Sequence, residues 1–327
     1  MNADTQYDVY FLINNDIHIL DMAGPCQAFH EANERTHRFR LHYIGFRKEV
    51  SSFQGLALTN LSTPPDTLPK HAIVIVCASK FKADIFSDSE SKQSIEWLKR
   101  APNPDTLILG ICTGTFLLGK AGLLDNKQCT THHSLTRELA QRFPQAEVIA
   151  DRIYTKTGNV FTTAGVTAGI DLCLRIIEML ADPKCSVDIA RELVVHRRRM
   201  ANDPQLSHHL SFRNHVSPLI HSVQDYICSH YHERLSTADL SDTFRVSQRH
   251  LQRLFKEYTG ITLKEYITQL RLEEAKSLLE SCKTIEQAAY LSGFSQPSSL
   301  RAAWKKYYGS LPGSSKAQMQ SHDAVMP

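Results

Sequence analysis

The sequence predicts two domains of different class, an α/β domain followed by an all-α domain. The length of 327 residues is about twice that of a common single domain, and 42% hydrophobic with 22% charged residues is ordinary globular composition. Short apolar runs alternate with helical patterns over the first 200 or so residues, whereas helical spacing alone remains from Pro218 onward. We therefore expect an N-terminal domain over 1–200, a linker over 201–213, a C-terminal domain over 214–316 and a disordered tail over 317–327.

The N-terminal domain is predicted to be doubly wound and flavodoxin-like. Several of its strands are continuously apolar, as expected of a parallel sheet that helices cover on both faces. Strands are predicted over Val9–Ile13, Leu41–Phe46, Ile73–Cys77 and Thr106–Ile111, and helices over Gly24–Arg35, Ser91–Arg100, Thr113–Ala121 and Ser134–Phe143. A hairpin with its turn over 156–159 follows, and then two more helices up to about Met200.

Composition excludes several classes of protein. No apolar run approaches the roughly 20 residues that cross a bilayer, and the first residues show no secretion signal, so we expect a cytoplasmic protein without a membrane partner. The eight cysteines are scattered without a Cys-x-x-Cys pair, which argues against a disulfide framework or a zinc site. We expect reduced cysteines that mostly fill the core, no metal and no cofactor.

The C-terminal segment repeats itself. Ser236 matches Thr284 and Ser247 matches Ser295 at an offset of 48, while Phe255 matches Trp304 and Gly260 matches Gly309 at an offset of 49. Each copy begins with a capping pattern, Ser236-x-x-Asp239 or Thr284-x-x-Gln287, and continues through a short helix, a turn and a second helix that starts at Ser247 or Ser295. This order predicts two helix-turn-helix units.

One long helix, predicted over Thr262–Cys282, joins the two units. Its 21 residues would span about 31 Å, close to the roughly 34 Å between successive major-groove faces on one side of a DNA duplex. Residues 214–316 hold 13 Lys and Arg against 10 Asp and Glu, so the whole net charge of +3 resides there. The spacing and the charge indicate that one chain fills two adjacent grooves of double-stranded DNA.

The second helix of each unit carries the candidate DNA-contacting residues. Arg and Gln suit the donor and acceptor pattern of base edges, whereas Lys suits phosphate. The candidates are Gln248, Arg249, Gln252, Arg253 and Lys256 in the first unit, and Gln296, Ser298, Ser299, Arg301, Lys305 and Lys306 in the second. The second set is less basic at its start, so we expect weaker base readout there. The alternative is a helical interaction bundle with a solvated basic face.

These residues resemble the double helix-turn-helix domain of AraC/XylS-type transcription regulators. The resemblance rests on Ser247-x-x-x-Leu251-x-Arg253-x-Phe255-Lys256, on Gly260, on Arg271-x-x-x-Ala275 and on Gly293-Phe294, and covers about 100 residues. The chain departs from the family pattern with Leu263 in place of the usual Pro, Leu300 in place of Phe, and Ala302 where Arg is common.

A cysteine marks the candidate site of the N-terminal domain. The run from Leu107 to Thr115 leads a buried strand directly into a helix, with Cys112 at the turn. Such an elbow points its side chain into the crevice at the carboxyl end of the sheet, and the start of the helix is expected to favour thiolate. Asp21, Thr131-His132-His133 and Thr163-Ala164-Gly165 are candidates to converge there.

These segments resemble the ThiJ/PfpI superfamily, which is class I glutamine amidotransferase-like, and the whole layout resembles the GlxA family of regulators. The resemblance implies that Asp21 takes the acidic position and Cys112 the nucleophile position. Protease-like members carry His directly after the cysteine, where this chain has Thr113, and Trp is common at the position of His133. Isonitrile hydratases keep an Asp, Cys and Thr arrangement that Asp21, Cys112 and Thr113 would reproduce.

We therefore expect a transcription regulator rather than an enzyme. Its N-terminal domain is expected to form a homodimer and to bind a small-molecule effector through Asp21, Cys112, Thr113, His132 and His133, and the resemblance implies small nitrogen compounds. Its other partners would be operator or promoter DNA and, for an activator, RNA polymerase, which places it at the nucleoid. The alternatives are a structural or dimerising N-terminal domain, and a cysteine-dependent hydratase or amidase with an accessory DNA-binding tail, whose catalytic candidates are Cys112, Asp21, Thr113 and His132.

Overall fold

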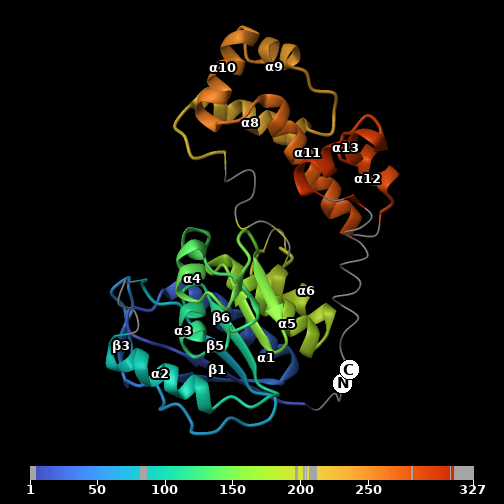
Figure 1. The fold of residues 1–327 in the computed structure, drawn as a ribbon. Coiled ribbons are helices and arrows are strands. Elements are labelled where there is room, and N and C mark those ends of the chain that lie inside the picture. Colours follow the sequence, from blue (N-terminus) through green and yellow to red (C-terminus); the bar gives the residue numbers. More distant parts are fainter. Residues whose placement is uncertain are drawn as a thin grey trace. The chain divides into compact units, whose positions relative to one another are not determined.

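The chain forms two compact units, Met1–Gln205 and Leu206–Pro327 (Figure 1). The computed structural model describes residues 5–81, 87–195, 198–201, 203, 205, 212–280, 283–309 and 311–312. Within this part of the chain, no helix is both long and apolar enough to cross a lipid bilayer.

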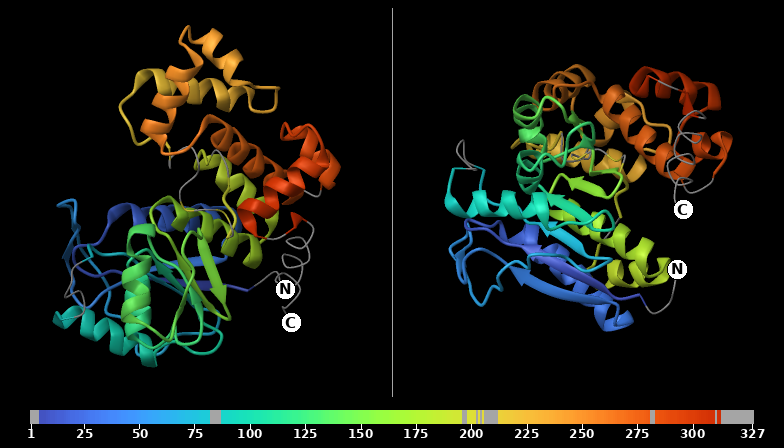
Figure 2. Two further views of the ribbon diagram at one scale, coloured as in Figure 1. Left: turned by 45° about the horizontal axis from the view of Figure 1, so that its top comes forward. Right: turned by 60° about the horizontal axis from the view of Figure 1, so that its bottom comes forward.

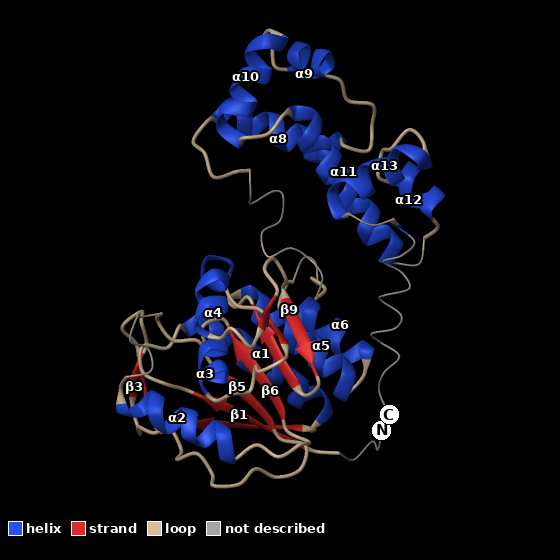
Figure 3. Cartoon of the chain, in the orientation of Figure 1, coloured by secondary structure: helices blue, strands red, loops and turns tan. Residues whose placement is uncertain are grey.

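The N-terminal unit is built on a six-stranded mixed sheet (Figure 3). Its strand order is β2 (Phe39–Ile44), β1 (Tyr7–Leu12), β5 (Ile73–Val76), β6 (Leu107–Ile111), β10 (Val160–Thr163) and β9 (Tyr154–Thr157). Neighbouring strands are parallel except β9 and β10, which form the predicted hairpin at one edge. The predicted doubly wound α/β class is confirmed, with an antiparallel edge strand. Two further pairs of two-residue strands, too short to show a period, are β3 (Val50–Ser51) with β4 (Ala57–Leu58) and β7 (Gln128–Cys129) with β8 (Glu147–Val148).

Helices cover both faces of the sheet (Figure 2). One face packs against α1 (Ile19–Thr36), α5 (Thr167–Leu180) and α6 (Pro183–Glu192), and the other against α2 (Ser89–Arg100), α3 (Gly114–Lys120) and α4 (Thr136–Arg142), which follows the short helix η1 (His133–Leu135). Strand β1 shows the division, because Val9 and Phe11 enter one core while Tyr10 and Leu12 enter the other.

Helix α1 begins at Ile19, five residues before the predicted start at Gly24. Gly24 and Pro25 lie inside the helix and are buried, although such a pair is typical of a helix boundary. A Cβ on Gly24 would lie 2.8 Å from Cγ1 of Ile170 on α5. Close packing between the two helices therefore explains the glycine, and tertiary contact overrides the local preference.

Both ends of the predicted linker pack onto the units that they adjoin. Ile153 donates its N–H to the Asp203 carbonyl, and the Gln205 side chain donates to the Thr131 carbonyl at 2.8 Å. On the other side, Gln224 donates to the carbonyl of Phe212 at 2.8 Å. These contacts leave 206–211 between the two packed ends, and this stretch and the predicted tail over 317–327 lie outside the described residues.

The C-terminal unit is helical and holds two separate cores. Its helices are α8 (Pro218–His230), α9 (Thr237–Thr243), α10 (Gln248–Thr259), α11 (Leu263–Glu280), α12 (Ile285–Leu291) and α13 (Pro297–Tyr308). The first core gathers α8, α9, α10 and the start of α11, including Leu251, Phe255 and Tyr266; the second gathers the end of α11 with α12 and α13, including Ala275 and Trp304. One helix thus supports both helix-turn-helix units.

The two units repeat in backbone detail. Ser236 with Asp239 and Thr284 with Gln287 both form complete capping boxes. Gly260 and Gly309 both end their helices in the left-handed conformation, with φ of 77° and 71°.

One predicted helix start of this unit was wrong. Helix α13 begins at Pro297 with Gln296 as its N-cap, one residue after Ser295, because the residue before a proline favours extended backbone. Helix α11 is described over 18 residues, which gives about 27 Å, and the predicted end of this helix at 281–282 lies outside the described residues.

Candidate functional site

The predicted elbow lies between β6 and α3. Cys112 adopts φ of 52°, an unusual conformation for a residue with a side chain. Its N–H donates to the Thr163 carbonyl at 3.0 Å, and its carbonyl accepts from the Thr131 hydroxyl at 2.8 Å. A Cβ on Gly114 would lie 2.2 Å from the Val76 carbonyl oxygen, so the helix can begin this close to β5 only with glycine there. Backbone contacts on both sides therefore hold the elbow.

Asp21 and Cys112 meet at Gly165. A Cβ on Gly165 would lie 2.7 Å from Asp21 Oδ1 and 2.8 Å from the Cys112 sulfur, so glycine is required at this contact. Val166 donates its N–H to Asp21 Oδ1 at 2.5 Å, and His18 Nδ1 lies 3.1 Å from Oδ2. Burial nevertheless raises the pKa of Asp21 above its usual value, against the opposing effects of Val166 and His18.

The Cys112 side chain is a thiol at neutral pH. Burial, and after it the nearby charge of Asp21, raises the pKa of Cys112 to about 12. Backbone N–H groups of Thr113 and His132 face the sulfur and lower the pKa, but they do not compensate. The N–H groups at the helix start therefore favour thiolate, as expected, but desolvation outweighs them.

The other predicted ligand-binding side chains point to different partners. The Thr113 hydroxyl donates to the Ser79 carbonyl at 2.6 Å. The His132 ring bonds to the Ser134 hydroxyl at 2.8 Å and packs on the exposed His133 ring, and burial, then His133, lowers the pKa of His132. Among the described residues, no hydrogen bond joins an imidazole to the Cys112 sulfur. The structure thus brings Asp21 and Cys112 together, and adds only backbone groups of Thr113 and His132.

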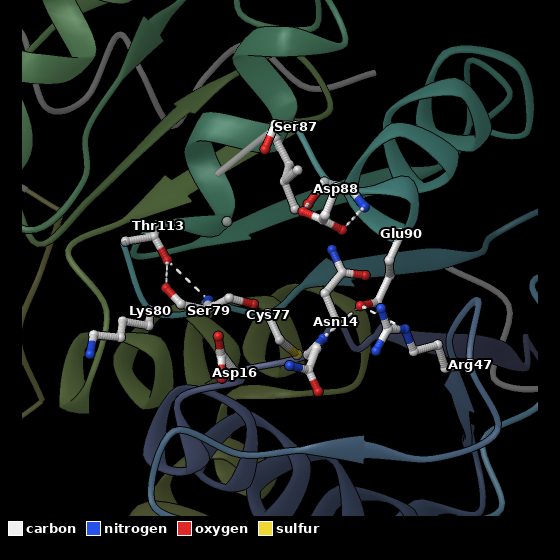
Figure 4. A pocket seen from close by; sticks show the side chains of 14 residues that line it. Asn14, Asp16, Arg47, Cys77, Ser79, Lys80, Ser87, Asp88, Glu90 and Thr113 are labelled. Atoms are coloured by element: carbon white, nitrogen blue, oxygen red, sulfur yellow. Dashed lines mark hydrogen bonds and ion pairs between the residues drawn. The ribbon is translucent and has the colours of Figure 1, made fainter. Parts of the chain in front are cut away.

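A polar cavity of about 180 Å³ lies beside the elbow, at the carboxyl ends of β1 and β5 (Figure 4). Thr113 is the only one of the five predicted ligand-binding residues among its lining residues. Glu90 from α2 also lines it and is 3% exposed, and burial raises the pKa of Glu90 against the lowering effects of the Asn15 N–H and Arg47. Within the described part of the chain, no three His, Cys, Asp or Glu side chains are arranged to hold a metal ion.

Glu90 was not among the predicted site residues, although its spacing in the sequence indicates a special position. Glu90 shares a helix face with Ser94, Trp97 and Leu98, all of which are buried. A charged residue on the buried face of an amphipathic helix is uncommon without a partner or a role. The pattern of α2 could therefore have indicated a site at its start.

The candidate recognition helices α10 and α13 present polar side chains to solvent. All eleven residues predicted to contact DNA are exposed: Gln248, Arg249, Gln252, Arg253, Lys256, Gln296, Ser298, Ser299, Arg301, Lys305 and Lys306. Arg253 pairs with Glu257 at 2.9 Å and Arg301 with Glu286 at 3.2 Å. Because both pairs are exposed, they hold their arginines only weakly and leave them available to another partner.

Arg271 and Gly293, both part of the AraC-type pattern, have structural roles. Arg271 on α11 donates to the carbonyls of Tyr231 and Glu233, each at 2.7 Å. Gly293, in the turn between α12 and α13, has φ of 86°, and a Cβ there would lie 2.5 Å from the Tyr231 carbonyl oxygen. These contacts join the second helix-turn-helix unit to the end of α8, in the first core.

Two family models match the chain. The DJ-1/PfpI family matches residues 7–179, and a helix-turn-helix domain matches residues 240–318. The first match covers more than half of the chain and the second covers both helix-turn-helix units.

Three curated relatives span different parts of the chain. The HTH-type transcriptional regulator GbdR of Pseudomonas aeruginosa is 25% identical over 309 residues, 92% of this chain and 82% of that protein. The HTH-type transcriptional regulator GlxA of Rhizobium meliloti is 29% identical over 246 residues, 74% of each chain. An isonitrile hydratase of Pseudomonas putida is 28% identical over 176 residues, 52% of this chain and 70% of the enzyme.

The two regulators extend over both units of this chain, whereas the hydratase matches about half of it. The sheet with its cysteine elbow and the duplicated helical unit agree with the two family matches. The chain belongs to the DJ-1/PfpI family and joins a domain of that family to an AraC-type double helix-turn-helix domain.

Proposed function

We propose that the chain is a sequence-specific DNA-binding transcription regulator whose N-terminal unit binds a small metabolite. The observation that carries the proposal is the pair of capped helix-turn-helix units, each with an exposed polar recognition helix, on the shared helix α11. Helix-turn-helix proteins place the second helix of the unit in the major groove. The names of GbdR and GlxA as transcriptional regulators support the same function.

The helical interaction bundle is the rival for the C-terminal unit. The buried centre of a protein–protein interface is depleted of charged residues, whereas the first turns of α10 present Gln248, Arg249, Gln252 and Arg253. Arginine and glutamine at the start of an exposed helix favour DNA, because both can make paired hydrogen bonds to base edges.

Regulation requires an effector that distinguishes two states of the protein. A metabolite that binds equally to the DNA-competent and DNA-incompetent states would not shift the equilibrium between them. The N-terminal unit must therefore bind the metabolite more tightly in one of the two states. A small nitrogen compound is the proposed effector class. The proposal includes a homodimer formed through the N-terminal unit, contact with RNA polymerase if the regulator activates, and action at the nucleoid in the cytoplasm.

A genome-wide map of sites bound by the full chain tests the regulator. Binding should concentrate at promoters that share a sequence, and the neighbouring genes should change expression when the chain is deleted. Uniform occupancy of the genome would contradict sequence-specific regulation.

The second candidate function is a cysteine-dependent hydratase or amidase. The meeting of Asp21 with Cys112 and the isonitrile hydratase relative favour it. Catalysis by cysteine needs thiolate and a base, yet burial raises the pKa of Cys112 to about 12 and the His132 ring bonds elsewhere. These observations favour a non-catalytic elbow.

The state of Cys112 can be measured directly. At pH 7, iodoacetamide should modify Cys112 slowly, because the thiol predominates until the pH approaches 12. Purified chain should not turn over an isonitrile or an amide. Turnover that disappears in Cys112→Ala would establish the enzyme instead.

A further inference from the structure

The polar cavity beside the elbow contains a buried carboxylate oxygen without a partner. Glu90 accepts the Asn15 N–H on Oε2 at 3.0 Å, and Arg47 Nε lies 3.7 Å from the same oxygen. Oε1 is buried and has no hydrogen-bond partner among the described residues. A buried polar atom without a partner is unfavourable, so native proteins that keep one commonly use it.

A second buried atom of the cavity also lacks a partner. The Ser79 hydroxyl has none within the described residues, while the Ser79 backbone is held by the Thr113 hydroxyl through its carbonyl at 2.6 Å and its N–H at 3.1 Å. Figure 4 shows Asn14, Glu90 and Arg47 on one side of the cavity and Ser79 and Thr113 on the other. A ligand between them would meet Oε1 on one side and a hydroxyl on the other.

The lining favours a cationic group at Glu90. Asp16 and Asp88 line the cavity together with Glu90, so three carboxylates share it. Lys80 and Arg47 line it as well, and both are exposed. Arg47 lies beside Glu90, whereas Figure 4 shows Lys80 on the opposite side of the cavity. The buried acid thus suits a positive group, and Lys80 suits a negative group at the other end of the same molecule.

The lining also discriminates among cations. None of the described residues that line the cavity is aromatic. Quaternary ammonium groups have no N–H to donate, and proteins recognise them with aromatic cages. Such a group would leave Oε1 without a hydrogen bond, whereas a primary ammonium or a guanidinium would satisfy it.

We propose that this cavity is the effector site of the N-terminal unit, and that it takes a small zwitterion whose ammonium or guanidinium group donates to Glu90 Oε1. Its carboxylate lies towards Lys80, and the Ser79 hydroxyl bonds to its polar middle. Quaternary ammonium compounds are excluded as tight ligands. This assignment rests on the proposed function, because it takes effector binding as the role of the N-terminal unit.

Calorimetry on the purified full-length chain tests the site without knowledge of the operator. The probes are unbranched ω-amino acids of two to six carbons, each compared with its N-trimethyl counterpart and its des-amino counterpart of the same length. At least one amine should bind, and it should bind at least about 10-fold more tightly than both counterparts, because each counterpart lacks N–H donors for Oε1. Equal binding of an N-trimethyl counterpart, or no binding by any amine at 10 mM-scale concentration (roughly 3 kcal/mol of binding free energy), would overturn the proposal.

Variants separate the site from general damage. Glu90→Gln keeps the shape of the side chain and should weaken the amine at least about 10-fold, and Ser79→Ala should weaken it several-fold. The matched control is Glu96→Gln on the same helix, since Glu96 is exposed and pairs only with Lys99 on the surface. Unchanged unfolding temperatures would show that both cavity variants fold, and unchanged amine affinity in Glu90→Gln would contradict the site.

Measuring DNA binding with the same samples distinguishes a failure of the effector site from a failure of the proposed regulator function. A chain that binds a specific promoter but no amine would overturn the effector site alone. A chain that binds the amine but shows no sequence preference for DNA would overturn the regulator and leave the cavity assignment intact.

Discussion

The two helix-turn-helix units share one backbone plan but carry different chemistry on their recognition helices. Helix α10 presents Gln248, Arg249, Gln252 and Arg253 in its first two turns, whereas the start of α13 presents two serines and Arg301. The lysines of α13 lie in its last turn. Since paired donors and acceptors read bases and ammonium groups hold phosphate, the difference suggests that α10 selects sequence and α13 contributes more to backbone contact.

The turns of the two units also differ. Arg245 in the first unit and Gly293 in the second occupy matching positions, and both have positive φ, 53° and 86°. Only glycine fits at the second position, where the Tyr231 carbonyl approaches. Duplication therefore preserved the turn, while packing determines which residue each copy requires.

The largest expected effect comes from that packing. Gly293→Ala should destabilise the chain by about 3 kcal/mol or more, because it adds a clash with backbone to the cost of positive φ. Gly260→Ala, where no neighbour lies within 4 Å, should cost only about 1 kcal/mol. Urea unfolding of both variants measures the difference, and equal losses would contradict the packing account.

The division of labour between the recognition helices predicts the next effect. Arg249→Ala and Arg253→Ala should each cost about 1–3 kcal/mol in specific DNA affinity and relax sequence preference, while Arg301→Ala should cost less. Fluorescence anisotropy on a selected duplex measures this. Arg100→Ala, which removes an exposed side chain from the N-terminal unit, is the control and should change nothing. A larger loss of specific DNA affinity from Arg301→Ala than from the two α10 variants would instead assign sequence selection to α13.

The two capping boxes should contribute equally to the free energy of unfolding. Ser236→Ala and Thr284→Ala should each lower the free energy of unfolding by about 1 kcal/mol, because each removes the side chain that accepts the N–H at the third helical residue. Thermal and chemical unfolding would measure both losses. If only one of the two variants lost stability, the two capping boxes would not be energetically equivalent.

The smallest effect concerns phosphate contacts at the end of α13. Replacing Lys305 or Lys306 with Gln should reduce the slope of log affinity against log salt by about one unit for each lysine. Sequence preference should stay unchanged. An unaltered slope would remove these lysines from the DNA interface.

Local chemistry made much of the fold predictable. The capping boxes and the strands of the sheet follow from short patterns, and the structure confirms them. The start of α1 did not follow, because the buried contact between Gly24 and Ile170 joins distant segments. The start of α13 was also shifted, because Pro297 favours extended backbone at the residue before it.

The candidate site was predictable in position but not in chemistry. The strand-to-helix turn placed Cys112, but its pKa depends on burial and on Asp21, which lies far away in sequence. The cavity depends on Glu90 and Ser79, brought together from different elements. Sequence spacing alone could indicate that Glu90 lies on a buried helix face, but not that one of its oxygens lacks a partner.

Selection of bound duplexes from a random DNA library tests the central claim most directly. The full-length chain should enrich one site with two parts whose centres lie about one helical turn apart, roughly 10 base pairs. The double variant Arg249→Ala and Arg253→Ala should lose the enrichment in one part only, the part that α10 reads. Failure to enrich any sequence, or enrichment of the same two-part site by the double variant, would contradict the proposed regulator.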